Sequence, residues 1–205
     1  RGLLFHVDGC IGGFLLPYFR RLGARVPAFD LSVPGVTSIS MDFHKYAYAP
    51  KGASVIVYRD RALRRHQIYA CAAWTGYTVV NTTVQSTKSG GPLAATWALL
   101  RAVGDAGYLD LARRTLAATR TIVAALREIP GLRVLGEPEM SLVAFTADAG
   151  GPPIFPLADA MKARGWLVQP QFGGLGSPAN LHLTISAGHL AVADRFVADL
   201  RAAVD

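Results

Sequence analysis

The sequence predicts an α/β protein, with part of a mostly parallel sheet followed by a small α+β unit. Three observations support this fold class. Short apolar runs alternate with helical patterns over the first half of the chain. A long helical pattern comes next, and shorter strands and helices follow it. We therefore expect one domain over residues 1–110 and a second over residues 111–205.

The first half of the chain contains the predicted sheet. Three apolar runs read as strands, the first two of them buried on both faces: LLFHV (3–7), ASVIVY (53–58) and VTSIS (36–40). After the first run, IGGFLLPYFRRLG predicts a helix that ends at Gly23, with Pro17 near its middle. A strand, a helix and a strand in this order are typical of parallel strands joined by right-handed crossovers.

The second half is predicted to be mainly helical at first. GPLAATWALLRAVG (91–104) predicts a helix of small residues. A longer helix follows and stops at Pro130-Gly131. Its apolar stripe, broken only by Thr119, contains Leu109, Ala112, Leu116, Val123 and Leu126. The remaining predicted elements are a strand at 142–147, a helix at 155–165, a short strand at 166–169, a loop at 169–178, a strand at 180–186 and a last helix with Leu190, Ala193, Val197, Leu200 and Val204 on one face.

The composition argues against several classes of protein. Apolar residues make up 51% of the chain, which favours a buried core over disorder. The longest apolar stretch is shorter than a membrane span and contains Arg101. The net charge is +7, but the cations are dispersed, so we expect anionic small molecules and no nucleic acid. Two cysteines, Cys10 and Cys71, make neither a disulfide framework nor a metal site, which favours a cytoplasmic protein.

Asp8 and Lys45 are the main candidates for chemistry. Asp8 closes the first strand, at the edge where α/β sheets bind ligands, although an aspartate there also suits a helix N-cap. Lys45 comes soon after a neighbouring strand. Such a pair can serve pyridoxal phosphate, because the amine attacks the aldehyde and the carboxylate keeps the ring nitrogen protonated. Only a neutral amine attacks, so we expect burial to lower the pKa of Lys45.

Three neighbours of this pair have two interpretations each. His44 either bonds a backbone carbonyl or contacts a cofactor phosphate. His6 shares a face with Asp8 and either orients it or is an ordinary core histidine. Cys10 suits packing against a flat ring better than nucleophilic attack. Farther along, QSTKSGG (85–91) precedes a helix and predicts either an anion site or an ordinary cap.

Two long motifs resemble a known family. HVDGCIGGF (6–14) and GVTSISMDFHKYAYAPKGASVIVY (35–58) resemble the pyridoxal-phosphate-dependent group II decarboxylase superfamily, and within it the sphingosine-1-phosphate lyases. The later STKSGG stretch is similar to that family's Gly-Ser-Arg-Pro-Gly-Gly segment. The resemblance implies the fold-type-I, transferase-like fold, with the C-terminal part of the large domain and the small domain present. The chain starts at Arg1 and enters a strand almost at once, so we expect it to be a piece of a longer polypeptide that also holds the family's upstream half.

The resemblance also implies a role for individual residues. It makes Lys45 the catalytic Schiff-base lysine and Asp8 the partner of the pyridine nitrogen. His44 would act in catalysis or at the cofactor phosphate, and Cys10 would pack against the ring. Ser86 matches a serine that reaches the phosphate of the neighbouring subunit's cofactor, so a homodimer with shared sites is implied.

The implied activity is that of a carbon–carbon lyase. A phosphorylated amino alcohol would displace Lys45, form an external aldimine and split by a retro-aldol reaction. Loss of carbon dioxide from an amino acid is the alternative, because it uses the same electron sink on a different bond. A further alternative is a non-catalytic fragment or scaffold of the same fold.

Overall fold

The structure is a computed structural model that describes residues 2–83, 85 and 87–204. The chain forms two compact units. The first contains Arg1–Arg21 and Val26–Tyr108, and the second contains Leu22–Arg25 and Leu109–Asp205. Each unit has its own sheet and its own buried side chains.

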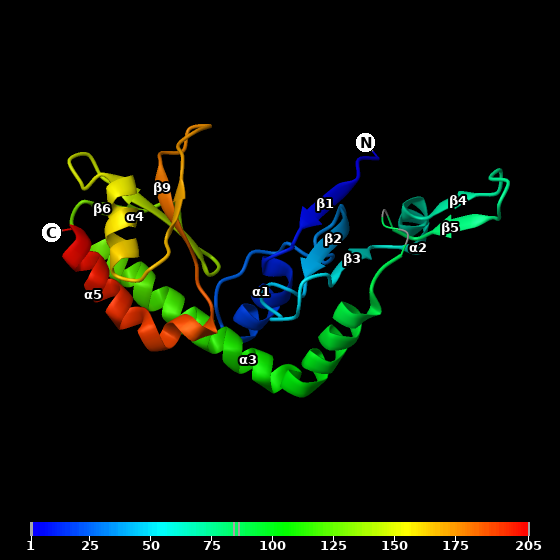
Figure 1. Ribbon diagram of the computed structural model, residues 1–205, viewed down its shortest axis with the longest axis horizontal. Helices are drawn as coiled ribbons and strands as arrows, with labels where there is room; N and C mark the ends of the chain where they lie inside the picture. The colour runs from blue at the N-terminus through cyan, green and yellow to red at the C-terminus, as the bar shows by residue number, and fades with distance from the viewer. Residues whose placement is uncertain (1, 84, 86, 205) are drawn as a thin grey trace. The chain divides into compact units, whose positions relative to one another are not determined.

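The first unit is built on a three-stranded sheet in the order β1-β2-β3 (Figure 1). Its strands are β1 (Phe5–Asp8), β2 (Val36–Asp42) and β3 (Ser54–Tyr58). The prediction of parallel strands is confirmed for β1 and β2, which pair with Asp8 opposite Ser40. It is wrong for β3, which runs antiparallel to β2. The cause is the short β2–β3 connection, which has no crossover helix to reverse the chain direction.

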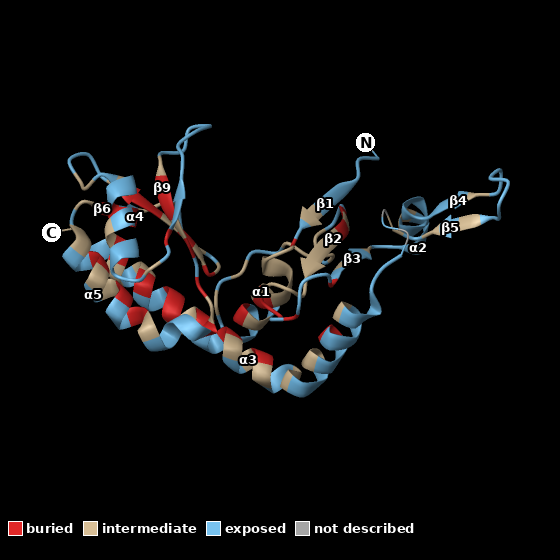
Figure 2. Ribbon diagram, in the orientation of Figure 1, coloured by how far each residue is buried: buried red, intermediate tan, exposed pale blue. Residues whose placement is uncertain are grey.

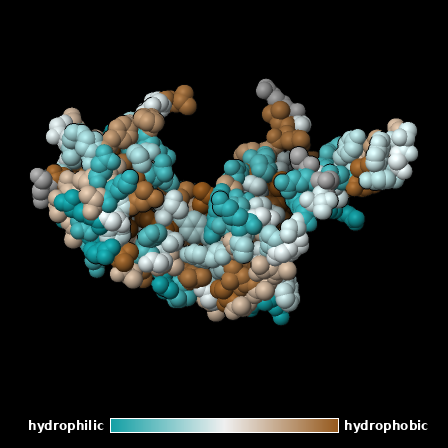
Figure 3. All heavy atoms as spheres, viewed as in Figure 1, coloured by the Kyte–Doolittle hydropathy of each residue, from teal (hydrophilic) through white to brown (hydrophobic). Residues whose placement is uncertain are grey.

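The predicted burial of the first strands on both faces is also wrong. Leu3 and Leu4, which precede β1, are 80% and 74% exposed, and Ile56 in β3 is 47% exposed. Figure 2 shows β1 and β3 largely exposed or half-buried, and Figure 3 shows apolar surface on the N-terminal segment. Apolar runs predict strands by their composition, but burial depends on what packs on each face.

One helix and one tyrosine anchor the loop that follows β2. Helix α1 (Gly12–Arg21) continues through Pro17, and Gly23 just beyond it has a φ of 78°. Its Phe14 ring lies 4.9 Å from the ring of Tyr108. The Tyr108 hydroxyl donates to the Ala47 carbonyl at 3.0 Å in a buried position. A packed aromatic cluster therefore supports the loop that follows β2.

After β3 the chain forms a small segment outside the three-stranded sheet. The sequence did not predict this segment. It contains α2 (Arg61–Arg64), the 3-10 turn η1 (Arg65–Gln67) and the two-stranded hairpin of β4 (Tyr69–Cys71) and β5 (Val79–Asn81). Helix α2 begins at an N-cap, because Asp60 accepts a hydrogen bond from the Leu63 amide at 2.8 Å. The strands are too short to give a clear alternating pattern in the sequence.

The two helices predicted over residues 91–104 and beyond are confirmed, and both lie within α3 (Gly90–Glu128). It is interrupted at Gly104, which has a φ of 62° and a ψ of 176°. Only glycine adopts this conformation without strain, so the predicted helix end at residue 104 appears as a break inside α3. Thr119, the polar residue of the apolar stripe, is buried and donates its hydroxyl to the Thr115 carbonyl.

The second unit has a four-stranded antiparallel sheet in the order β6-β7-β9-β8. The predicted strand and helix after the Pro130-Gly131 stop are confirmed as β7 (Leu142–Ala147) and α4 (Ile154–Ala163). The other elements are β6 (Leu132–Val134), β8 (Gln169–Gln171), β9 (Asn180–Thr184), η2 (Ala187–Val192) and α5 (Ala193–Val204). The short strand expected at 166–169 is displaced to β8, because its pairing with β9 is set by register and not by the apolar run.

A single apolar core holds this unit together. Phe145 in β7 and Leu181 in β9 are opposite each other and fully buried. They meet side chains of α3, α4 and α5, which include Leu126, Met161 and Leu200. Figure 2 shows the buried residues gathered where these helices face the sheet. Among the described residues, no helix is both long and apolar enough to cross a membrane.

Candidate functional site

The candidate site is built on the turn that joins β2 to β3. Backbone hydrogen bonds close this turn, from Lys45 to the Asp42 carbonyl at 3.4 Å and from Ala49 to the Phe43 carbonyl at 3.0 Å. Tyr48 within it has a φ of 59°, an uncommon conformation for a residue with a side chain. The turn therefore presents His44 and Lys45 at the end of β2 where Asp42 leaves the sheet.

Asp8 lies at the end of β1, beside this turn. Its Oδ1 accepts hydrogen bonds from the Cys10 amide at 3.0 Å and from the Ser40 hydroxyl at 3.1 Å. The cap interpretation is not what the structure shows, since the carboxylate caps the local turn at Cys10 and not an amide of α1. Hydrogen bonds from Cys10, then that from Ser40, hold the pKa of Asp8 below its ordinary value. The carboxylate is therefore charged at neutral pH.

Lys45 forms an ion pair that the sequence analysis did not include. Its Nζ lies 3.0 Å from Oδ2 of Asp42, and its side chain is 31% exposed. It also shares a hydrogen bond with the Cys10 side chain, which in turn bonds Asp8. Cys10 thus lies near both the amine of Lys45 and the carboxylate of Asp8, to which its amide donates.

The expected effect of burial on Lys45 is wrong. The hydrogen bond with Cys10 raises the pKa of Lys45 more than burial lowers it, and the Asp42 carboxylate raises it further. The cause is that the side chain is too accessible for burial to outweigh its partners. The free amine of Lys45 is accordingly held as an ammonium ion.

The two histidines contact different groups. His44 Nδ1 lies 3.4 Å from the Ala53 carbonyl, in agreement with the backbone interpretation, and its Nε2 lies 3.6 Å from Asp42 Oδ2. His6 Nδ1 lies 2.8 Å from the Ser38 hydroxyl, its neighbour on β2. The geometry thus brings Asp8, Cys10, His44 and Lys45 together, and it directs His6 to a serine.

The remaining predicted site residue, Ser86, lies outside the described residues. Its surroundings are partly described. A cleft of about 520 Å³ lies between the turn at Gly52 and the start of α3, and Thr87, Lys88 and Ser89 line it. One lysine and two hydroxyl groups face this cleft, beside a helix N-terminus. The predicted anion site there stays a prediction.

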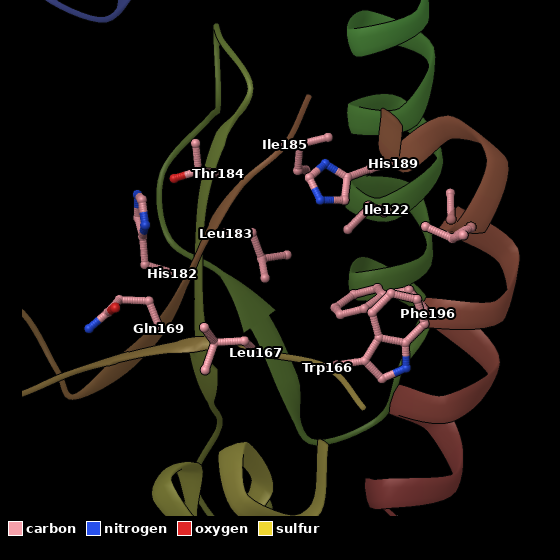
Figure 4. Close-up of a pocket in the computed structure, with 12 residues that line it drawn as sticks. Ile122, Trp166, Leu167, Gln169, His182, Leu183, Thr184, Ile185, His189 and Phe196 are labelled. Carbon is pink, nitrogen blue, oxygen red and sulfur yellow. The ribbon is translucent and has the colours of Figure 1, made fainter. Parts of the chain in front are cut away.

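A second cavity, of about 220 Å³, lies in the C-terminal unit (Figure 4). Leu183, Ile185 and Phe196 give it an apolar lining, and Trp166 packs edge-on against Phe196. Among the described site residues predicted from the sequence, none lines this cavity. Its His189 is already engaged in a capping box with Ser186.

Asp42 is a residue of the candidate site that the sequence analysis did not single out. Its signal was present, because an aspartate and a lysine three residues apart at a strand end can meet across a turn. Such spacing is common, and the geometry of the turn decides whether the two side chains meet. Chemically, the site offers an amine for an aldehyde, a charged carboxylate for a cationic ring nitrogen, and an imidazole.

The chain is similar to known proteins over most of its length. Residues 1–148 match the family described as the pyridoxal-dependent decarboxylase conserved domain. The chain is 41% identical to the sphingosine-1-phosphate lyase of Arabidopsis thaliana, over 100% of this chain and 36% of the plant protein. It is 36% identical to a probable L-tyrosine/L-aspartate decarboxylase of Methanothermobacter thermautotrophicus, over 80% of this chain and 44% of that protein.

A solved structure supports the same relationship. The sphingosine-1-phosphate lyase of Burkholderia pseudomallei superposes with a TM-score of 0.90 at 43% identity, over 98% of this chain and 45% of that one. The resemblance and the fold that it implied are thereby confirmed. The chain spans about a third of the length of the plant lyase. Because the family match covers most of the chain and includes both motifs, the chain belongs to the pyridoxal-dependent decarboxylase family.

Proposed function

We propose that this chain is part of a pyridoxal-phosphate-dependent carbon–carbon lyase that cleaves a phosphorylated amino alcohol by a retro-aldol reaction. One observation carries the proposal. Asp8 closes β1 and Lys45 follows the adjacent parallel strand β2, and a hydrogen bond from the Asp42 amide to the Cys10 carbonyl joins the two segments. The lyases of Arabidopsis thaliana and Burkholderia pseudomallei, to which the chain is similar, favour this reaction.

The residues present fit pyridoxal phosphate. Asp8 is held charged by its hydrogen bonds, so it can pair with a protonated ring nitrogen. Lys45 carries an accessible amine within the same hydrogen-bonded group. Cys10 lies between them, where it can pack against the ring, and His44 can donate to the phosphate or the substrate. When bound, the cofactor supplies an electron-accepting ring that makes bonds at the substrate carbon breakable.

Each side chain then has a defined task. Asp8 holds a proton at the ring nitrogen by its negative charge. Lys45 anchors the cofactor through Nζ and, when released, can move a proton at the reacting carbon. His44 is proposed to act beside it in catalysis, because its imidazole lies on the same turn. Ser86, which lies outside the described residues, is proposed to reach a phosphate.

A decarboxylase acting on an amino acid is the second candidate. The similarity to the probable L-tyrosine/L-aspartate decarboxylase of Methanothermobacter thermautotrophicus favours it. The two reactions need the same amine and the same carboxylate, and they differ in the bond that is aligned for cleavage. The choice between the two reactions therefore depends on which substrate binds. The residues around Lys45 serve both reactions equally.

We also propose a homodimer with shared sites in the cytoplasm. The support for the dimer is the family resemblance of the STKSGG stretch. The support for the cytoplasm is that Cys10 and Cys71 are both free thiols. Sedimentation of the purified protein at its natural full length tests the first point, and a single monomer species would contradict it.

The cofactor is tested by loading the full-length protein with pyridoxal phosphate. We expect a visible absorption band and, after borohydride reduction, a pyridoxyl group on Lys45. Lys45→Ala should abolish both signals, because the attacking amine is gone. Lys162→Ala, on the exposed face of α4, is the matched control and should bind normally. A pyridoxyl group found only on other lysines would favour the scaffold alternative and contradict the proposal.

The reaction is tested by product analysis. The loaded protein is given a phosphorylated long-chain base and, separately, a panel of amino acids. A fatty aldehyde with an amino phosphate supports the lyase. Carbon dioxide released from an amino acid, without the aldehyde, would establish the decarboxylase instead.

A further inference from the structure

Asp42 occupies a position that is fixed by two neighbouring segments. It is the last residue of β2 and lies opposite Ser54, the first residue of β3. Its amide donates to the Cys10 carbonyl at 3.2 Å, in the loop after β1. The backbone of Asp42 is therefore held from both sides before its side chain makes any contact.

The carboxylate of Asp42 divides its two oxygens between different partners. Oδ1 accepts the Ser54 hydroxyl at 2.5 Å. Oδ2 lies 3.0 Å from Lys45 Nζ and 3.6 Å from His44 Nε2. The Asp42 side chain is only 18% exposed, which makes this a more sheltered ion pair than one on an open surface. One residue thus contacts both of the predicted catalytic side chains.

We propose that Asp42 is a positioning residue for Lys45, and that its carboxylate, oriented by Ser54, pairs with the free amine, stabilises it as an ammonium ion and so raises the pH at which that amine can react. The inference rests on the proposed function in assigning the amine to cofactor attachment. The carboxylate itself touches neither cofactor nor substrate in this scheme. It acts through Lys45 and, by the same oxygen, orients His44.

The charges around Lys45 agree with this role. Cys10 and Asp42 interact with its amine, Asp8 is near enough for a charge interaction with Lys45, and His44 lies beside the same Asp42 oxygen. Cys10 contributes most to raising the pKa of Lys45, and Asp42 adds both a hydrogen bond and its charge. Burial raises the pKa of Asp42 but hydrogen bonds from Ser54 and Lys45 lower it more, so Asp42 stays anionic at neutral pH. Removal of the Asp42 charge should therefore make the neutral amine available at lower pH.

The wild-type protein provides the first test. The chain contains four lysines, Lys45, Lys51, Lys88 and Lys162, and mass spectrometry resolves the peptide of each. The full-length, cofactor-free protein is labelled with a trace of acetic anhydride from neutral to alkaline pH. Lys45 should reach half-maximal labelling at a higher pH in the folded protein than in the protein unfolded in urea. A folded-state profile at the same pH as the unfolded one, or at a lower pH, would overturn the proposal.

The second test replaces the charge of Asp42 by a group of the same shape. In Asp42→Asn the Lys45 profile should move to lower pH, and its labelling near neutral pH should rise by a factor of about three or more. Lys51, Lys88 and Lys162 in the same sample should not change. Asp60→Asn is the matched control, because it removes one charge but keeps a good N-cap for α2. An unchanged Lys45 profile in Asp42→Asn would refute the inference.

A milder variant keeps the test valid if Asp42→Asn does not fold. Ser54→Ala leaves the charge of Asp42 but frees its Oδ1, so the Lys45 profile should shift in the same direction by a smaller amount. A folded Ser54→Ala protein with no shift would count against the proposal. Acetic anhydride labels amines without the cofactor, so this outcome is independent of the proposed function. That function fails separately, if borohydride traps no pyridoxyl group on Lys45.

Discussion

At the scale of single residues, the site is a connected set of hydrogen bonds that runs across three segments. Ser40 and Cys10 hold Asp8, Cys10 also bonds Lys45, and Lys45 bonds Asp42. Two carboxylates therefore flank one ammonium group. Such a set keeps Asp8 and Asp42 ionised, because each carboxylate has donors that favour its charged form.

The charge on Asp8 predicts a pH dependence. Its pKa is lower in the folded protein than in the unfolded chain, so the contribution of Asp8 to stability is present above the unfolded pKa and is lost as the pH falls through the folded one. Asp8→Asn keeps the shape but removes the charge. The urea midpoint of wild type should exceed that of Asp8→Asn at neutral pH. The difference should begin to shrink at about pH 4, near the unfolded pKa, and should be lost only as the pH falls through the lower folded pKa.

The control for this prediction is Asp159→Asn, on the exposed face of α4. This substitution removes one charge and leaves the hydrogen bonds to Asp8 in place. Its urea midpoint should follow wild type at both pH values. A wild-type advantage over Asp8→Asn that persists unchanged in acid would contradict the electrostatic account.

At the scale of elements, α3 shows how one glycine separates two helices. The chain is helical on both sides of Gly104, and the non-helical backbone of that residue makes a kink between the two helices. Space is not the constraint at that position, since a Cβ at Gly104 would meet nothing within 4 Å. The constraint is the backbone conformation, which other residues adopt only with strain.

Gly104→Ala should therefore destabilise the protein by about 1–3 kcal/mol, a typical cost of this backbone strain. Chemical denaturation measures the change in the free energy of unfolding. Gly91→Ala in the same helix is the matched control, because its Cβ would make an ordinary contact at 3.6 Å from the Ser89 hydroxyl. Equal stability of the two variants would show that the break at Gly104 carries no strain.

At the scale of the whole molecule, each unit has its own means of cohesion. The C-terminal unit is held by one large apolar core. The N-terminal unit has fewer large buried side chains and depends more on polar contacts such as those of Arg59, whose guanidinium donates to the carbonyls of Leu31, Val33 and Val36. A substitution in either core should thus act first on its own unit.

Leu181→Ala tests this separation. Leu181 is fully buried in β9, so its truncation should cost about 2–5 kcal/mol. Hydrogen exchange followed by mass spectrometry should show faster exchange in peptides of residues 109–204 than in those of residues 26–83. Leu167→Ala, at a side chain 91% exposed, should change little. Faster exchange spread equally over both ranges would contradict independent cores.

Much of the fold could be predicted from local patterns. The helix over residues 155–165 and the strand over residues 180–186 were found because apolar periodicity and nearby glycines act within one segment. The antiparallel course of β3 and the hairpin of β4 and β5 were not predicted. Strand direction depends on the path of the connection, and very short strands leave almost no pattern.

The sequence by itself determined the family, the alternation of strands and helices, and the placement of Asp8, Cys10, His44 and Lys45 near one sheet edge, because motif order and hydrophobic spacing are properties of the linear chain. Only the tertiary structure decided that Asp42 pairs with Lys45, that Cys10 links Lys45 to Asp8, and that β1 and β3 stay exposed in the described structure. These depend on the distance between atoms on different segments, and a change of about one ångström in such a distance makes or breaks a hydrogen bond.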